Sequence, residues 1–175
     1  MQQVRDVMTV HPLVMQDTAT ILDAARAMAD ANVGSVLVVD RHDALFGLVT
    51  DRDIVTRAVV TARALDATRL GEMCTEEVAT VSPSDSVIDA LNVMRKNAVR
   101  RVPVVLGDKP VGIMSLGDVA VRSSDLVAGE LKAALSGITS AATSDLPTET
   151  GSGVSASLRE MWDVPPMAPA HPEGA

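Results

Sequence analysis

A hydroxyl residue followed three positions later by an aspartate occurs twice in this chain. The first copy reads GLVTDRD and covers residues 47–53, and the second reads GIMSLGD and covers residues 112–118. A carboxylate accepts charge-assisted hydrogen bonds, so an aspartate beside a hydroxyl at the end of a strand can hold the vicinal diol of a ribose. The candidate ribose-binding pairs are Thr50 with Asp53 and Ser115 with Asp118.

The same pattern also has a structural interpretation. A hydroxyl with an acid three residues later is close to a helix capping box, in which the two side chains bond free N–H groups at the start of a helix. Either copy taken singly is better explained as a cap. The repetition, each time with a glycine three residues before the hydroxyl, favours binding, and both interpretations stay open.

Arginines stand where the phosphates of a nucleotide would lie. Arg52 belongs to the first phrase, and Arg100 and Arg101 directly precede the apolar run at 102–105. A guanidinium can clamp a phosphate with two hydrogen bonds, and the alternative is an ordinary solvated start of a strand. The first half has glycine and serine at 34–35 in this place, so any phosphate site is asymmetric.

Other chemistries have little support in the sequence. The single cysteine, Cys74, cannot form an internal disulfide, and the three histidines, at 11, 42 and 171, lack metal-ligand spacing. No histidine is paired with an evident nucleophile, and no phosphate-binding loop of the Walker type is present. We therefore expect no catalytic residue, no metal site and no required cofactor.

Composition indicates a globular protein with an acidic end. Hydrophobic residues make up 47% and charged residues 22% of the 175 positions, and no apolar run is long enough to span a membrane. Residues 1–122 carry 13 basic and 16 acidic side chains, whereas residues 123–175 carry 2 and 7. With no basic stripe and no signal-peptide pattern, we expect a cytoplasmic protein that binds neither nucleic acid nor membrane.

The repeated phrases belong to a longer internal duplication. Alignment of Met8 with Cys74 continues along both halves with few interruptions, and one deletion near residue 106 brings the two phrases into register. Two equal halves predict a pseudo-two-fold arrangement with equivalent clefts. The identical pairs are Thr9/Thr75, Asp23/Asp89, Ala24/Ala90, Met28/Met94, Val33/Val99, Val36/Val102, Val38/Val104 and Val39/Val105.

Each half contains the same order of elements. Apolar residues at helical spacing predict a helix from residue 21, capped by Thr18 or Thr20, and a second helix from residue 87 after Ser84. β-branched runs separated by turn residues predict a hairpin over 36–49 and another over 102–114. Each repeated phrase then opens a further helix, so each half is a β-α-β-β-α unit of the α/β (α+β) class.

The sequence divides into four segments. Residues 1–66 and 67–122 are the two repeats, and apolar spacing predicts a C-terminal helix within 123–136. Residues 137–175 are rich in Ser, Thr, Gly and Pro, so we expect a disordered acidic tail. Two interpretations exist for Leu158, Met161 and Trp162 within that tail. They form a short docking segment, or, as we favour, Trp162 is simply unpacked.

These residues together resemble the tandem cystathionine β-synthase (CBS) domain pair, also called a Bateman module. The phrases match that family's Gly-apolar-apolar-Thr/Ser-x-x-Asp pattern, and the openings DVMT at 6–9 and EMCT at 72–75 and the strand RRVPVV at 100–105 also match. The resemblance covers roughly residues 4–122. It implies two pseudo-symmetric repeats packed sheet to sheet, helices outside, in a stand-alone module that forms a homodimer.

The resemblance also implies a ligand and its site. Clefts of this family bind AMP, ADP, ATP or S-adenosylmethionine, the two hydroxyl–aspartate pairs would hold ribose, and Arg52 and Arg101 would meet phosphate. The second phrase has Gly117 in place of an arginine, so a phosphate there depends on Arg101. Backbone groups that would frame the base lie near Thr18, Val36, Ser84 and Val102.

Two functions follow from this sequence. The leading hypothesis is a non-enzymatic regulatory or sensor module that binds an adenosine-containing small molecule and signals to an effector protein still to be identified. The alternative is a dimeric structural or interaction module with no nucleotide ligand, in which the repeated phrases serve only as caps. The choice of adenosine ligand, and whether one or both clefts are occupied, stay open.

Overall fold

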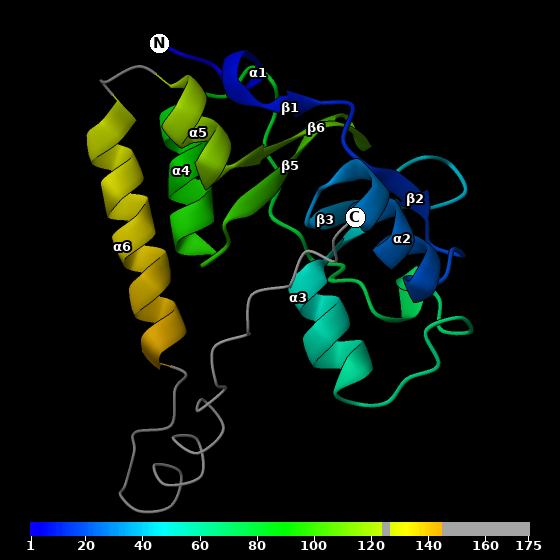
Figure 1. Cartoon of the computed structure of the whole chain (residues 1–175). Helices are drawn as coiled ribbons and strands as arrows, with labels where there is room; N and C mark the ends of the chain where they lie inside the picture. Colours follow the sequence, from blue (N-terminus) through cyan, green and yellow to red (C-terminus); the bar gives the residue numbers. More distant parts are fainter. Residues whose placement is uncertain (124–126, 145–175) are drawn as a thin grey trace, which may run out of the picture. The chain divides into compact units, whose positions relative to one another are not determined.

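Two three-stranded sheets organise the residues that the computed structural model describes, 1–123 and 127–144 (Figure 1). In the first half β2 (Val14–Gln16) pairs parallel with β3 (Ser35–Val39), which pairs antiparallel with β4 (Leu45–Thr50). In the second half β6 (Lys109–Ser115) lies between β5 (Arg101–Leu106) and β1 (Thr9–Val10), antiparallel to both. The α/β (α+β) fold class predicted from the sequence is confirmed.

The helices follow the same duplication. Each hairpin is preceded by a longer helix and followed directly by a helix that starts in a repeated phrase. Among the described residues the helices are α1 (Val4–Val7), α2 (Ile21–Ala31), α3 (Asp51–Asp53), the π-helix η1 (Ile54–Val59), the 3₁₀-helix η2 (Leu70–Glu72), α4 (Val87–Lys96), α5 (Leu116–Arg122) and α6 (Ala128–Ser144).

The hairpins match each other even in their irregularities. The register of β3 with β4 shifts between Val38 and Val39, and that of β5 with β6 shifts between Val104 and Val105. These are the positions that the internal duplication aligns, so the two halves share one hairpin geometry. The predicted hairpins are confirmed.

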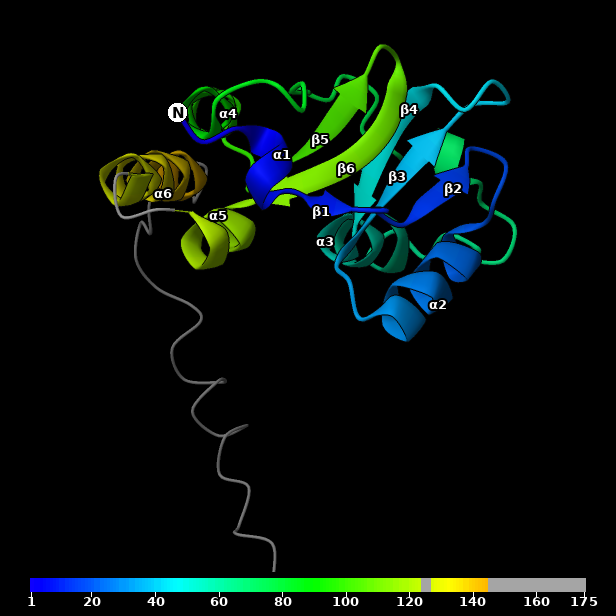
Figure 2. The same cartoon turned by 90° about the horizontal axis from the view of Figure 1, so that it is seen from above.

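The opening segment of each repeat joins the sheet of the other half. Thr9 of β1 pairs with Ile113 of β6, and at the equivalent place Thr75 forms a bridge with Leu48 of β4. Figure 2 shows β1 alongside β6 before the chain continues to β2. The chain therefore crosses between the two sheets twice, once between β1 and β2 and once between Thr75 and Val81.

The hydrophobic cores show the same exchange. Val4 and Val7 of α1 are fully buried in the core of the second half. At the positions 66 residues later, Leu70 and Met73 are buried in the core of the first half. Because each core needs an opening segment from the other repeat, separation of the halves would expose apolar surface on both.

Helix caps explain where α2 and α4 begin. The Thr20 hydroxyl accepts from the Asp23 backbone N–H at 3.1 Å, and the Ser86 hydroxyl accepts from the Asp89 N–H at 3.0 Å. Of the two caps predicted for the first helix, Thr20 is therefore the one used. The second helix begins at Val87 as predicted, but its cap is Ser86 rather than Ser84, because only Ser86 has an acid three residues later to complete the cap.

The C-terminal helix is longer than predicted. We expected it to lie within 123–136, but α6 continues to Ser144, so residues 137–144 are helical rather than part of a disordered tail. Ile138 continues the apolar stripe into the core of the second half, and Gly137 lets α6 approach the Arg95 side chain of α4 closely. Figure 1 shows α6 lying along α4 and α5.

The rest of the predicted tail, with Leu158, Met161 and Trp162, lies outside the described residues. Within the part of the chain that is described, no helix is both long enough and apolar enough to cross a membrane.

Candidate functional site

The first repeated phrase forms a capping box where β4 ends. The Thr50 hydroxyl accepts from the Asp53 backbone N–H at 3.2 Å and donates to Asp53 Oδ2 at 2.6 Å. The Thr50 backbone N–H donates to the same oxygen at 2.9 Å. The other carboxylate oxygen, Oδ1, lies 3.7 Å from Nη1 of Arg57, and the Asp53 side chain is 25% exposed.

The second phrase repeats this geometry where β6 ends. The Ser115 hydroxyl accepts from the Asp118 N–H at 3.1 Å and donates to Asp118 Oδ2 at 2.5 Å, and the Ser115 N–H donates to that oxygen at 2.9 Å. Both phrases are therefore capping boxes, and the structural interpretation of the sequence pattern holds for both.

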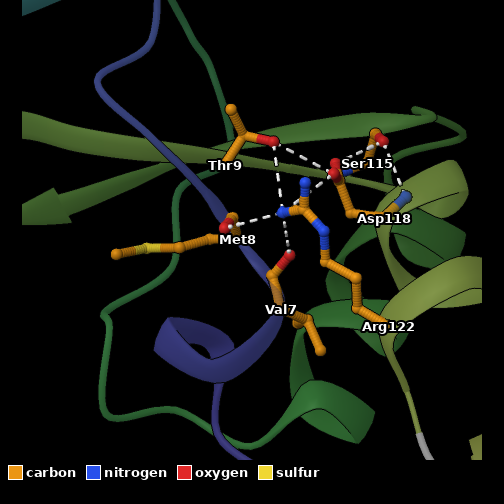
Figure 3. A network of polar contacts seen from close by, with 6 residues as sticks. All are labelled: Val7, Met8, Thr9, Ser115, Asp118 and Arg122. Carbon is orange, nitrogen blue, oxygen red and sulfur yellow. Dashed lines mark hydrogen bonds and ion pairs between the residues drawn. The ribbon is translucent and has the colours of Figure 1, made fainter.

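Asp118 differs from Asp53 in what its second oxygen contacts. Oδ1 of Asp118 accepts from the Thr9 hydroxyl at 3.0 Å and lies 3.5 Å from Nη1 of Arg122. The same Arg122 nitrogen donates to the carbonyl oxygens of Val7 and Met8, each at 3.1 Å (Figure 3). The carboxylate is thus fastened to the opening segment of the other repeat.

The glycine of each phrase is explained by the same crossing of segments. A Cβ at Gly47 would lie 2.7 Å from both Cys74 Sγ and the Thr75 carbonyl oxygen. A Cβ at Gly112 would lie 2.7 Å from Met8 Sδ. A side chain at either position would collide with the opening segment that pairs with the strand, so the pattern needs glycine here.

Residues of the second phrase line a cleft of about 280 Å³. Ser115 and Asp118 line it together with Arg101, so three of the site residues predicted from the sequence come together there. Its size is near the lower end of the range for small-molecule pockets. The other lining residues are Thr9, His11, Pro12, Leu13, Asn32, Val33, Gly34, Ser35, Leu37 and Ile113.

A second, larger groove of about 540 Å³ adjoins this cleft. The two hollows share the residues 32–34 after α2 and the side chain of Arg101. Beyond Arg101 the groove is largely apolar, with Asp51 as its acidic residue. The lining residues that it does not share are Ala25, Met28, Ala29, Asp51, Ile54 and Val55.

Only Asp51 of the first phrase lines either hollow. Thr50, Arg52 and Asp53 line neither of these two hollows, so Arg52 does not join Arg101. The Arg101 side chain reaches instead across the position of Gly34, where a Cβ would lie 3.3 Å from Nη2. The sequence led us to expect that the two halves differ here, because residues 34–35 are glycine and serine where residues 100–101 are arginines. In the structure the arginine of the second half extends over the glycine of the first.

The four positions expected to frame the base lie outside both hollows. Val36 and Val102 are fully buried in the cores of their own halves. The Thr18 carbonyl oxygen accepts from Arg69 Nη1 at 2.8 Å, and the Ser84 hydroxyl contacts that of Ser82 at 3.0 Å. Their backbone contribution to a ligand site stays a prediction.

Sequence reasoning missed the contribution of the opening segment to the cleft. Thr9, His11 and Leu13 line it, although they lie more than 100 residues before Asp118. The identity of Thr9 with Thr75 marked the segment as part of the duplication. The strand exchange that carries it to the other half leaves no local signal.

The surroundings of Cys74 disfavour a reactive thiolate. Burial raises the pKa of the Cys74 thiol, and the nearby charge of Glu76 raises it further, so this cysteine is a poor nucleophile near neutral pH. Within residues 1–123 and 127–144, no three residues of the His, Cys, Asp and Glu types gather closely enough to hold a metal ion.

Comparison with protein families matches the chain twice. The model of the CBS domain family covers residues 4–59 and 70–125. These ranges contain both repeated phrases and both opening segments.

Similar proteins carry the same domains. The CBS domain-containing protein YhcV of Bacillus subtilis is 38% identical over 123 residues, which are 70% of this chain and 86% of that protein. The mitochondrial CBS domain-containing protein CBSX3 of Arabidopsis thaliana is 36% identical over 104 residues. That match is 57% of this chain and 50% of CBSX3, so the chain spans about half of this relative.

One similar protein has been solved with ligands bound. The CBS domain pair of protein MJ0100, in complex with 5′-methylthioadenosine and S-adenosyl-L-methionine, superposes with a TM-score of 0.63 at 26% identity. The match covers 69% of this chain and 98% of that chain.

Proposed function

Because the chain belongs to the CBS domain family, we propose that it is a non-catalytic regulatory module that binds an adenosine-containing small molecule. One observation carries the proposal: Ser115, Asp118 and Arg101 line a single cleft together with apolar side chains of both halves. Support also comes from the MJ0100 CBS pair, which is similar and binds two adenosine compounds.

The cleft offers a partner for each part of such a ligand. Asp118 would accept from a ribose hydroxyl through Oδ1, the oxygen outside the capping box, in place of the Thr9 hydroxyl that now donates to it. Leu13, Val33 and Ile113 provide aliphatic walls between which an adenine ring would lie. Arg101 stands at the edge of the cleft with its guanidinium available for the group attached to the ribose.

Regulation would follow from the way the halves are joined. A ligand in this cleft touches residues of both repeats, and a ligand shifts an equilibrium only as far as its affinities for the two arrangements differ. The arrangement would be read by a homodimer partner or by an effector protein. The cytoplasmic location also stays a prediction from the sequence.

One observation favours the alternative function, a dimeric interaction module with no nucleotide ligand. Both aspartates already accept hydrogen bonds within capping boxes, so their presence needs no ligand. In that case the cleft is a by-product of the packing of the two halves.

A thermal-shift screen separates the two functions. We expect AMP, ADP, ATP, S-adenosylmethionine or NAD to raise the melting temperature in a concentration-dependent way. The effect should be lost in Asp118→Asn and kept in Asp53→Asn, because only Asp118 lines the described cleft. If none of the five ligands raises the melting temperature, the proposed binding function is wrong.

A further inference from the structure

Two opposite charges converge where the cleft of the second phrase meets the larger groove. A Cβ at Gly34 would lie 2.9 Å from Asp51 Oδ2 and 3.3 Å from Arg101 Nη2. Arg101 lines both hollows, and Asp51 lines the groove. The absence of a side chain at Gly34 leaves open the space that both charged groups border.

These two groups are not paired with each other. Across residues 1–123 and 127–144, no hydrogen bond or ion pair involves the guanidinium of Arg101, although this residue is half-buried. Asp51 uses Oδ1 to accept from the backbone N–H of Arg52 at 2.7 Å, and its Oδ2 atom faces the space above Gly34. Each group therefore has unused hydrogen-bonding capacity directed at one place.

We propose that Arg101 and Asp51 form a subsite for the zwitterionic end of an adenosine ligand that carries an α-amino acid. The α-carboxylate would accept two hydrogen bonds from the Arg101 guanidinium, and the α-ammonium would donate to Asp51 Oδ2. This subsite rests on the proposed function, because the nucleoside part is held by Ser115 and Asp118 in the adjoining cleft.

The charges and the apolar lining select against other tails. A polyphosphate would satisfy Arg101 but would bring further negative charge toward Asp51, which repels it. An uncharged tail would leave the Arg101 guanidinium and the Oδ2 atom of Asp51 without a partner on the ligand. The groove beyond Arg101 is lined largely by apolar side chains such as Ala25, Met28 and Ile54, and Arg101 is its one basic lining residue among those the structure describes, so it offers a polyphosphate no second cation.

Calorimetric titration of the full chain with three probes tests the subsite. S-adenosylhomocysteine carries the zwitterion, 5′-methylthioadenosine has the same nucleoside and sulfur without it, and ADP carries a polyanion. We expect S-adenosylhomocysteine to bind about 10- to 100-fold more tightly than 5′-methylthioadenosine, since two charge-assisted interactions are added. ADP should bind more weakly than S-adenosylhomocysteine.

Asp51→Asn is the decisive variant. Asparagine keeps an oxygen acceptor for the Arg52 N–H, so the turn is preserved while the charge is removed. This variant should lose about tenfold or more in affinity for S-adenosylhomocysteine, leave 5′-methylthioadenosine unchanged and bind ADP more tightly than the wild type does. The matched control is Asp30→Asn, which changes net charge equally on the exposed surface of α2 and should alter none of the three affinities.

Gly34→Ala supplies a second, steric variant. Its methyl group would occupy the space between Asp51 and Arg101, so the advantage of S-adenosylhomocysteine over 5′-methylthioadenosine should shrink. Only the ends of two flexible side chains need to move, so the melting temperature of the unliganded protein should change little.

The outcomes separate the two proposals. If 5′-methylthioadenosine binds and S-adenosylhomocysteine binds no more tightly, or if Asp51→Asn leaves their ratio unchanged, the zwitterion subsite is wrong and the adenosine-binding function stands. If none of the three probes binds the wild-type chain, the zwitterion subsite is wrong, and the thermal-shift screen of the five ligands decides whether the adenosine-binding function stands.

Discussion

The phrases at 47–53 and 112–118 fold into the same capping box, yet their aspartates have different surroundings. Asp53 has one further partner, Arg57, at 3.7 Å, whereas Asp118 contacts both Thr9 and Arg122. The capping geometry follows from residues three positions apart and so appears in both copies. The difference comes from segments distant in sequence, which shows that identical local motifs acquire different roles through what packs against them.

Arg57 and Arg122 differ in the same way as the two aspartates. Arg57 and Arg122 each lie four residues after their aspartate, and their side chains are 45% and 47% exposed. Arg122 nevertheless bonds two backbone carbonyls of the opening segment as well. Two arginines at equivalent positions and with similar exposure therefore differ in role. Arg57 makes one weak local ion pair, whereas Arg122 connects α5 to the opening segment.

The largest expected effect comes from the glycines. Gly47→Ala should destabilise by about 3 kcal/mol, because its methyl would meet the Thr75 carbonyl oxygen, a backbone atom that moves only with the opening segment bridged to β4. Gly112→Ala should cost about 1 to 2 kcal/mol, since the closest atom belongs to the flexible Met8 side chain. Urea denaturation of both variants measures the difference.

Gly117→Ala is the control for the glycine variants. Position 117 lies in α5, and a Cβ there would be in ordinary contact, 3.5 Å from Ser115 Oγ. Alanine should therefore stabilise the helix by about 0.5 to 1 kcal/mol. Equal losses for all three variants would mean that the crossing of the opening segments does not restrict these positions.

The aspartates should rank next in size. Asp118→Asn removes a charge whose two oxygens are both engaged and whose side chain is 15% exposed, so it should cost about 1 to 3 kcal/mol. Asp53→Asn weakens mainly a cap, which is typically worth about 1 kcal/mol. Free energies of unfolding from urea titrations check this order, and a larger loss for Asp53→Asn would contradict it.

The arginines should show a smaller but more selective effect. Arg57→Gln breaks an exposed ion pair and should cost about 0.5 kcal/mol or less. Arg122→Gln also releases the Val7 and Met8 carbonyls and should cost about 1 kcal/mol. Hydrogen exchange should then accelerate at residues 4–10 in Arg122→Gln only, and unchanged exchange there would remove the proposed tie to the opening segment.

The smallest expected effect concerns Cys74, whose side chain lies against Gly47. Burial raises the pKa of the folded Cys74 thiol above its ordinary value of 9.0. The stability that its neutral form contributes is therefore complete below the unfolded pKa and is lost as the pH rises through the folded pKa. Urea titrations between pH 8 and pH 10 should show wild type losing more stability than Cys74→Ala, which has no thiol to titrate.

Local patterns were sufficient to predict the hairpins and the helices that flank them, and they offered the capping role of both phrases as one of two interpretations. The second long helix starts at Val87 as predicted, but its cap was assigned to Ser84, two residues before Ser86, which alone has an acid, Asp89, three positions later. The end of α6 was also misjudged. A polar composition suggested a tail from residue 137, but Ile138 finds an apolar surface that only the packed second half provides.

The sequence by itself determined the duplication, the strands and helices of each half and the identity of the hydroxyl–aspartate pairs, because these depend on residue type and short-range spacing. Only the tertiary structure decided which pair shares a cleft with Arg101, which aspartate is tied to Thr9, and why each phrase needs its glycine. The physical reason is the exchange of opening segments, which brings residues 4–13 against residues 112–122 through contacts that short-range sequence patterns do not encode.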